Sequence, residues 1–453
     1  MIGLKKKELK LFSKRKKVTF KRFFAWDCGD ETALVASESL NCDCGDGFIK
    51  TGLGMSTYYN ANGGTVSFPS SSLKLQQFNL LKTKTSGISY TTREMLISTT
   101  GNVYVYDTTS KAMKSKGSFG TKMQALNFPL EDLSISTLLY GDGFNLEYED
   151  VTGGSYLFGD ESKAACVYND RAFILIDPQY LYYTAPGNLR SIANVSDDAG
   201  RIFLPENKGK GVGLESLDGA LYVFFEYGIA RVSEVGSPME FLVEDVAYGE
   251  GKIIEGSVKR IKDKICFLTE NGIIKFDGKK AERAYAGMQV KPRLSNTDCR
   301  VAAQKNGWIL SFYAKNNKRT TLVLDFDFKN GYFTDEFIGL CECDGNAYCM
   351  NGSVLSLISE NGSLPPNAKF LFTSKEQDFS IKGKKTLKSL SVKGSGAATI
   401  CIKSGKNSRT YSLPLYAGEV KNFPMLRGES FVFEIDLESY SEVHSIEVEI
   451  EYD

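Results

Sequence analysis

Apolar and polar positions alternate along most of this chain in pairs of short runs, and a turn divides each pair. One pair spans residues 220–232 (ALYVFFEYGIARV) and another spans 264–276 (KICFLTENGIIKF). In the second, Asn271 and Gly272 supply the positive φ angles that a tight hairpin turn requires. Because alternation with a period of two is typical of half-buried strands, each pair predicts a β-hairpin.

Five more pairs of this kind recur along the sequence, and they begin near positions 95, 137, 172, 308 and 347. The spacing between successive starts is uneven but stays close to one repeat length. A period of roughly 40–50 residues built from short strands is typical of a β-propeller, in which each unit is one blade. The spacing therefore predicts an all-β fold with a propeller of about six to seven blades.

A second all-β module is predicted after Pro365 and Pro366, because a proline pair cannot continue a hydrogen-bonded ladder. Five runs with period-two alternation follow, at residues 386–394, 397–405, 408–416, 430–437 and 444–452. In the last run, Ile446, Val448 and Ile450 share one face, and glutamates occupy the other face. These runs predict a small C-terminal β-sandwich of jelly-roll type.

The expected division of the chain is therefore an arm and entry segment at 1–70, the propeller at 71–368 and the sandwich at 369–453. Hydrophobic residues make up 42% of the 453 residues and charged residues 24%, as in soluble globular proteins. No run approaches about 18 uncharged apolar residues, so we expect no membrane span.

Net charge is zero, but the two ends of the chain differ strongly. Residues 1–22 contain ten Lys or Arg and one acidic residue, Glu8, whereas residues 429–453 contain nine Asp or Glu and no Lys or Arg. Such blocks are usually solvated tails or faces. The alternative is that the basic arm contacts nucleic acid or an acidic partner subunit, with Lys14, Arg15, Lys16 and Lys17 as the candidate contacts.

The compartment is predicted from the N-terminus and the cysteines. The N-terminus lacks the 7–15-residue apolar core of a signal peptide, so we expect no secretory export. The ten cysteines are therefore expected to be reduced thiols in the cytosol.

Candidate chemistry is sparse. The chain has one histidine, His444, within a predicted strand, which leaves little basis for a catalytic triad. Cysteines stand two apart at Cys42 and Cys44 and again at Cys341 and Cys343, whereas zinc sites usually have C-x₂₋₄-C spacing. We expect buried structural thiols there, with zinc or a disulfide as alternatives, and we expect no metal ion and no cofactor.

Other candidate sites are expected to be turns and packing residues. The acidic stretches at 141–150 and 325–336 do not match a calcium-binding loop and are predicted to be hairpin turns, and the glycine-rich stretch at 208–213 is predicted to be an inter-blade loop. The propeller architecture leaves a carbohydrate-binding or glycan-cleaving protein as the alternative function. Only two tryptophans are present. The tyrosine pairs at 58–59 and 182–183 are the substitutes for sugar stacking, although tyrosines in strands are mostly packing residues.

A family resemblance enters at the two ends of the chain. Residues 38–41 (ESLN) and 47–54 (GFIKTGLG) resemble the entry segment of the propeller proteins in tailed-phage virions. That family usually has an arginine after the threonine, where this chain has Gly52. Residues 384–390, 426–435 and 444–450 are similar, in order, to the β-sandwich appended to such propellers.

The resemblance implies a non-enzymatic structural subunit of the phage tail or head–tail connector, in a ring around the DNA channel. Its implied location is the virion tail, after assembly in the host bacterial cytoplasm. The implied partners are copies of the chain itself, neighbouring tail or connector proteins and, through the basic arm, duplex DNA. The alternative is a carbohydrate-binding or glycan-cleaving propeller that acts at a cell surface.

Overall fold

The computed structural model of the protein describes residues 13–27, 32–44, 47–86, 89–149, 153–176, 180–192, 198–235, 237–288, 290–295, 298–360, 362–363, 368–415, 420–438 and 440–452. These residues are β-structure and turns apart from a single-turn 3-10 helix, η2 (Glu206–Lys208). The chain forms two compact units. Unit 1 comprises Met1–Gly52, Asn330–Asp335 and Pro365–Asp453, and unit 2 comprises Leu53–Lys329 and Glu336–Leu364.

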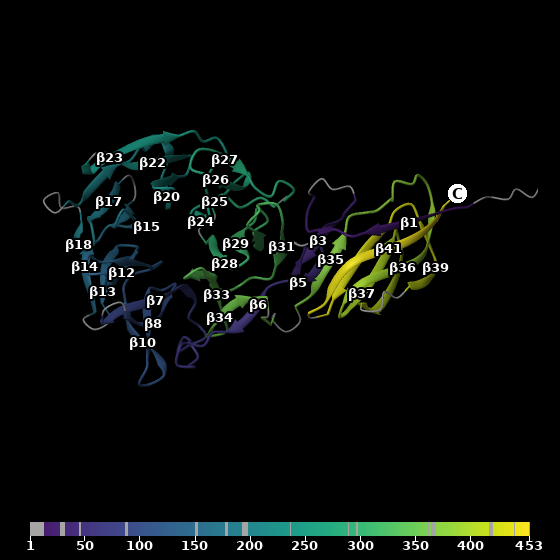
Figure 1. The fold of residues 1–453 in the computed structure, drawn as a ribbon, viewed down its shortest axis with the longest axis horizontal. Helices are drawn as coiled ribbons and strands as arrows, with labels where there is room; N and C mark the ends of the chain where they lie inside the picture. Colours follow the sequence, from purple (N-terminus) through teal and green to yellow (C-terminus); the bar gives the residue numbers. More distant parts are fainter. Residues whose placement is uncertain are drawn as a thin grey trace, which may run out of the picture. The chain divides into compact units, whose positions relative to one another are not determined.

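The propeller has seven antiparallel sheets within the described residues, and six of the sheets take four strands that are consecutive in the chain (Figure 1). Their strands belong to unit 2, except that the residues of β31 (Gly331–Thr334) are grouped with unit 1. The strands are β7 (Leu75–Ser86), β8 (Ser89–Ser98), β9 (Asn102–Asp107) and β10 (Ala112–Ser118); β11 (Gln124–Pro129), β12 (Ile135–Gly141), β13 (Phe144–Glu149) and β14 (Gly153–Phe158); β15 (Ser162–Tyr168), β16 (Arg171–Ile176), β17 (Tyr180–Ala185) and β18 (Asn188–Ile192), with β19 (Gly200–Phe203) also on β17; β20 (Gly211–Leu217), β21 (Ala220–Phe225), β22 (Gly228–Val235) and β23 (Ser237–Val246); β24 (Lys259–Ile261), β25 (Lys264–Thr269), β26 (Gly272–Phe276) and β27 (Ala281–Arg283); and β28 (Arg300–Gln304), β29 (Gly307–Tyr313), β30 (Arg319–Asp325) and β31 (Gly331–Thr334).

The seventh sheet closes the ring with a strand from far away in the sequence. It consists of β32 (Cys341–Cys343), β33 (Asn346–Asn351), β34 (Val354–Ser359) and β6 (Gly54–Thr57). The register pairs Thr57 with Ser356 and Gly54 with Ser359. The first strand of each sheet contacts the first strand of the next, and β32 contacts β7. Unit 2 is therefore a closed seven-bladed β-propeller.

The seven predicted hairpins are confirmed, and each forms the second and third strands of one blade. The hairpin predicted at 220–232 is β21 and β22, paired from Leu221 with Val232 to Phe225 with Gly228. The hairpin predicted at 264–276 is β25 and β26; Gly272 has the predicted positive φ, at 126°, whereas the positive φ predicted for Asn271 is wrong. Both hairpins bury their apolar side chains against neighbouring blades, as in the cluster that contains Phe224, Phe267 and Phe276.

Unit 1 is a β-sandwich of two sheets. One sheet runs β39 (Val420–Gly428), β36 (Lys385–Ser395), β41 (Glu442–Tyr452), β5 (Ile49–Thr51) and β4 (Cys42–Asp43), with β1 (Lys14–Phe20) also on β41; the other runs β2 (Phe23–Phe24), β3 (Leu34–Leu40), β35 (Phe370–Ser374), β40 (Val432–Leu437), β37 (Ala397–Ser404) and β38 (Asn407–Pro414). The predicted C-terminal sandwich is therefore present, and strands from the segment before Leu53 complete it.

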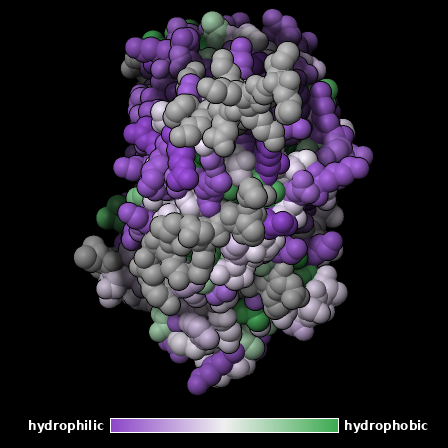
Figure 2. Space-filling model, turned by 90° about the vertical axis from the view of Figure 1, so that its right-hand side faces the viewer, coloured by the Kyte–Doolittle hydropathy of each residue, from purple (hydrophilic) through white to green (hydrophobic). Residues whose placement is uncertain are grey.

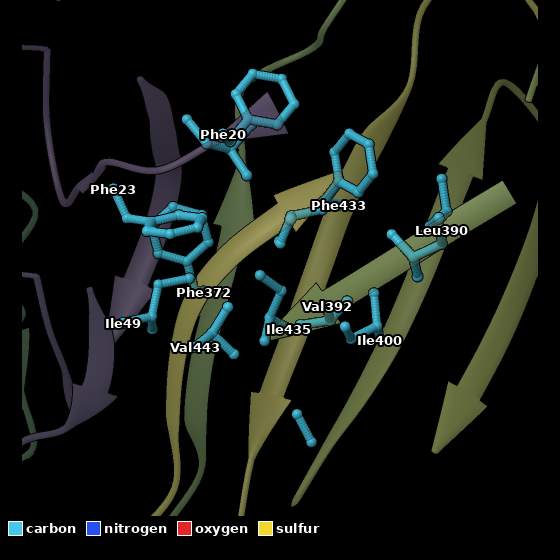
Figure 3. Close-up of a cluster of buried hydrophobic side chains, with 14 of the residues drawn as sticks. Phe20, Phe23, Ile49, Phe372, Leu390, Val392, Ile400, Phe433, Ile435 and Val443 are labelled. Atoms are coloured by element: carbon cyan, nitrogen blue, oxygen red, sulfur yellow. The ribbon is translucent and has the colours of Figure 1, made fainter. Parts of the chain in front are cut away.

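The core of unit 1 lies between its two sheets (Figure 3). Phe20 and Phe433 contact each other edge to face at 6.2 Å, and Phe23 packs on Phe372 at 6.1 Å. On β41 the side chains of Ile446, Val448 and Ile450 are buried, as the alternation predicts. The N-terminal segment thus contributes part of the core and is not only an appendage.

The observed units divide the chain differently from the expected segments 1–70, 71–368 and 369–453. Residues up to Gly52 belong to the sandwich unit, and the propeller unit begins at Leu53, since β6 is the fourth strand of the last blade. Pro365 and Pro366, where the break was expected, lie outside the described residues, and the unit boundary falls between Leu364 and Pro365. These boundaries are set by strands that pair although they lie far apart in the sequence. A local sequence pattern does not predict such pairing.

The surface drawn in Figure 2 is mostly hydrophilic where its residues are described, with small separated apolar patches. Among the described residues no helix is long and apolar enough to cross a membrane.

Candidate functional site

The four predicted contact residues, Lys14 to Lys17, lie on β1 at the edge of a sandwich sheet. This strand pairs antiparallel with β41, so that Arg15 stands opposite Glu451, Lys17 opposite Glu449, and Lys16 opposite Ile450. The chain therefore aligns its most basic described strand with its most acidic one.

The side chains of β1 alternate between the two faces of the sheet. On the outer face, Arg15 lies 3.5 Å from Glu449 and Lys17 lies 3.4 Å from Glu447. Lys16 alternates to the opposite face from Arg15 and Lys17, is also exposed, and donates a hydrogen bond to the carbonyl of Phe379 at 2.9 Å.

These contacts explain part of the difference in charge between the two ends of the sequence. The acidic partner of the basic strand is the end of the same chain, through Glu447, Glu449 and Glu451. Hydrogen bonds from Lys388 and Ser13 lower the pKa of Glu451. Arg15 and Lys17 nevertheless remain 64% and 68% exposed at their side chains, so both can still reach a partner in solution. The lysines before Ser13 lie outside the described residues.

The motif that carries the family resemblance contains a fully buried asparagine, Asn41. Its side-chain nitrogen donates to Asp335 Oδ2 and to the Lys369 carbonyl, each at 2.9 Å. Its side-chain oxygen accepts from Thr334 Oγ1 at 2.9 Å and from the Asp335 amide at 3.0 Å. The backbone of Asn41 sits at φ 56°, a left-handed conformation that asparagine tolerates better than most residues.

We call this set of residues (Asn41 with Phe333, Thr334, Asp335 and Lys369) the Asn41 junction. The Asn41 amide also donates to the Phe333 carbonyl at 2.7 Å, and the Gly52 amide donates to the Asn41 carbonyl at 2.8 Å. The junction therefore joins three segments of unit 1 that are far apart in sequence. Every polar atom of the Asn41 side chain has a partner, as a buried amide requires.

Two glycines of the same motif are explained by close backbone approach. A Cβ on Gly52 would lie 2.6 Å from the ring of Tyr332, and a Cβ on Gly54 would lie 2.2 Å from the carbonyl oxygen of Gly362. Neither position has room for a side chain. An arginine at position 52, as the phage family usually has after its threonine, would require a different local packing.

In the propeller, the first strands of several blades carry interacting charges. Lys259 on β24 lies 3.4 Å from Glu342 on β32, and Glu342 accepts a hydrogen bond from the Ala303 amide at 2.7 Å. Burial raises the pKa of Glu215 on β20, while attraction to Lys259 partly opposes that rise. Burial lowers the pKa of Lys259, but its attraction to Glu342 and Glu215 outweighs this and raises the pKa overall.

Arg300 on β28 connects three blades where the ring closes. Its guanidinium donates to the carbonyls of Leu75 at 3.2 Å, Gln76 at 3.0 Å and Leu340 at 3.5 Å. It also donates to the side-chain oxygen of Gln76 at 3.2 Å and pairs with Asp298 at 3.0 Å. Leu75 and Gln76 belong to the first blade and Leu340 directly precedes the last, so one side chain spans the closure.

Comparisons with known proteins identify no family. No family model matches this sequence, and no curated protein is similar to it. Among solved structures, the chain is similar to virginiamycin B lyase from Staphylococcus aureus (TM-score 0.43, 9% identity, covering 68% of this chain and 98% of that chain), to U3-55K (TM-score 0.41, 10% identity, 66% and 99%) and to YCF48 bound to D1 peptide (TM-score 0.43, 10% identity, 68% and 100%). The assignment of a propeller rests on the sheet order and the closed ring.

The paired cysteines are buried, as expected of structural thiols: Cys42, Cys341 and Cys343 lie in strands, and Cys44 follows the end of β4. Burial raises the pKa of Cys341 and of Cys343 to about 12, and it raises the pKa of Cys42 and Cys44 further. The described cysteines are free thiols, and no three His, Cys, Asp or Glu side chains among the described residues are grouped to hold a metal ion. Cys28 lies outside the described residues.

The remaining candidate positions lie in turns, strands and packed clusters. His444 lies exposed on β41, 3.0 Å from Glu442 and against the ring of Phe48. The two acidic stretches contain the turns from β12 to β13 and from β30 to β31, as predicted. The stretch at 208–213, predicted to be an inter-blade loop, is a loop only up to residue 210, because β20 begins at Gly211. Tyr58 and Tyr183 pack in propeller clusters, whereas Tyr182 is half-buried.

Proposed function

We propose that the protein is a non-enzymatic structural subunit of a tailed-phage virion, in the tail or in the head–tail connector ring. The observation that carries this proposal is the structural role of the residues that resemble phage propeller proteins. Asn41 makes four side-chain hydrogen bonds within unit 1, and Gly52 and Gly54 allow close backbone contacts. The resembling residues thus position the chain and present no reactive group.

The architecture also suits an assembly part. A propeller is a rigid body whose loops can vary without disturbing the packing of the blades. Here the ring is closed by β6, and both ends of the described chain are paired in one sandwich sheet through β1 and β41. A subunit with both ends held in sheets resists unravelling when neighbouring subunits pull on it.

The proposed partners are copies of the chain, neighbouring tail or connector proteins and duplex DNA. Arg15 and Lys17 are the exposed cations that DNA would meet, in competition with Glu449 and Glu447. If DNA binds there, its affinity should fall steeply with rising salt, because each neutralised phosphate releases counterions. A mobility-shift titration of wild type and the Arg15→Gln, Lys17→Gln double variant, at two salt concentrations, measures this. Salt-insensitive binding, or equal binding by the variant, contradicts a DNA contact at β1.

The proposed function is tested on particles. Phage particles produced by a host that carries this gene are purified on a density gradient and examined by mass spectrometry and by immunogold electron microscopy. The proposal expects several copies of the chain per particle and label at the tail or at the head–tail junction. Particles that lack the chain while it accumulates free in the lysate would overturn the proposal, as would a particle of normal infectivity after deletion of the gene.

A further inference from the structure

Four aromatic side chains form a continuous row at the outer part of blade three, beside blade two. Tyr180 and Tyr182 point to the same face of β17, and Phe203 pairs with Tyr180 across to β19. The ring centroids lie 5.5 Å apart for Phe158 and Tyr182, 6.3 Å for Tyr182 and Tyr180, and 5.2 Å for Tyr180 and Phe203. We call Phe158, Tyr182, Tyr180 and Phe203 the aromatic row.

The row borders a buried cluster of the propeller on one side and reaches solvent at Phe203. Phe203 is 66% exposed, and the other three rings are half-buried. Single exposed aromatic residues occur elsewhere, for example Tyr59 and Tyr227, and need no explanation by themselves. A contiguous row of one exposed and three half-buried rings is different, because it leaves connected apolar area in water and such areas commonly mark binding sites.

Polar groups with free bonding capacity lie on the same row. The guanidinium of Arg201 lies 5.6 Å from the centre of the Tyr180 ring and 5.4 Å from that of Phe203. Arg201 has no carboxylate partner among the described residues, and the hydroxyl groups of Tyr180 and Tyr182 make no hydrogen bond to a residue that the structure describes. By contrast, the nearby Arg190 is already paired with Glu147.

We propose that the aromatic row with Arg201 binds an acidic saccharide. A pyranose ring presents apolar C–H groups on its faces, which stack on aromatic rings, and hydroxyl groups at its rim, which suit the free tyrosine hydroxyls. A carboxylate on the sugar would pair with the Arg201 guanidinium, whose planar donors fit two carboxylate oxygens. Because Arg201 has no carboxylate partner in the part of the chain that the structure describes, its charge would select an acidic sugar over a neutral one.

The size and charge of the surface favour this occupant over larger ones. A stable interface with a second copy needs about 800 Å² per partner and about 20–30 residues on each side, far more than four rings and one arginine provide. A nucleic acid strand carries one phosphate per base and therefore needs a row of cations. The aromatic row offers Arg201, since Arg190 is neutralised by Glu147, and this suits a carboxylate better than a series of phosphates. The saccharide proposal does not depend on the virion role.

The test is calorimetric titration of the full chain with a hexasaccharide of galacturonic acid, and with the same hexasaccharide after methyl esterification, which removes its charge. The variants are Phe203→Ala, which removes the most exposed ring, and Arg201→Gln, which removes the cation. Tyr227→Ala is the matched control, because Tyr227 is 59% exposed and also lies near a cation, Lys252 at 5.9 Å, but outside the aromatic row. Circular dichroism confirms that each variant is folded.

We expect the acidic hexasaccharide to bind, and its affinity to fall about ten-fold in Phe203→Ala and in Arg201→Gln, with Tyr227→Ala within about two-fold of wild type. The esterified hexasaccharide should bind more weakly to wild type. Absence of binding overturns the proposal, and so does equal binding by wild type and both row variants. Equal binding of the two hexasaccharides overturns the assignment of an acidic sugar. Self-association that disappears in Phe203→Ala would assign the row to a contact between copies instead.

Discussion

Replacing Asn41 by alanine should destabilise unit 1 more than almost any other polar substitution. The change removes two donated and two accepted hydrogen bonds, all between buried or half-buried groups. A lost buried hydrogen bond costs about 1 kcal/mol net, and more where the partner stays unsatisfied, which gives about 3–4 kcal/mol here. Alanine at φ 56° adds about 1 kcal/mol, because it avoids the left-handed region.

The two tryptophans allow this effect to be assigned to one unit. Trp26 belongs to unit 1, where it lies 6.3 Å from the Phe333 ring, and Trp308 is buried in unit 2. In a Trp308→Phe background, urea unfolding followed by tryptophan fluorescence reports unit 1. A loss of about 4 kcal/mol lowers the urea midpoint by about 2 M for a module of this size.

Asn41→Asp is the matched variant, since it keeps the shape and the accepting oxygen. It also places a second carboxylate within hydrogen-bond distance of Asp335. We expect a similar loss at neutral pH and a partial recovery in mild acid, where the two carboxyl groups share a proton. Asn41→Ala should show no such recovery. In the Trp308→Phe background, a loss below about 1 kcal/mol for Asn41→Ala would refute the role given to the Asn41 junction.

Three further effects are expected. Arg300→Ala should destabilise unit 2 by about 2–4 kcal/mol in urea unfolding followed by Trp308 fluorescence. Arg231→Ala, which breaks an exposed ion pair, should cost less than about 1 kcal/mol. Equal losses in the two variants contradict the role of Arg300 in closing the ring. The pKa of Glu215 is raised in the folded state, so its contribution to stability is present in acid and is lost as pH rises through the folded pKa. Glu215→Gln should remove this part of the pH dependence of unit 2 stability, and an unchanged pH dependence contradicts the prediction. The pKa of Glu451 is lowered in the folded state, so its contribution to stability is present above its unfolded pKa and is lost as pH falls through the folded pKa. Glu451→Gln should reduce the loss of unit 1 stability in acid, and an equal loss in the variant and the wild type contradicts this.

Local patterns predicted the repeating part of the fold because each blade is built around a hairpin, whose two strands and turn follow one another directly in the sequence. The strand at residues 444–452 was also predicted face by face, since Ile446 and Glu447 alternate in a way that only a half-buried strand explains. The turn at Asn271 and Gly272 was predicted because an Asn-Gly pair is typical of tight hairpin turns.

The rest of the fold depends on pairings that no local pattern reveals. The segment Gly54–Thr57 has neither alternation nor a turn signal, and its partner strand lies at the opposite end of the propeller sequence. The strand Lys14–Phe20 was interpreted from its charge as an arm. The available signal was the matching glutamates at the other end of the chain, which complement Arg15 and Lys17. Nothing in the sequence marks Asn41 as buried, because an asparagine before a strand usually indicates a turn.

The closure of the propeller by β6 has a consequence for the synthesis of this chain. Gly54–Thr57 leaves the ribosome early, whereas its partner β34 is among the last parts of the propeller to be made. At about 5–20 residues per second, the synthesis between them takes on the order of 15–60 s. During that time the first blades exist with an open ring and unpaired strand edges. Translation that stops before β34 leaves every copy permanently open, so truncated chains should be recovered in aggregates and bound to chaperones, whereas the full-length chain contains β34 and can close its ring.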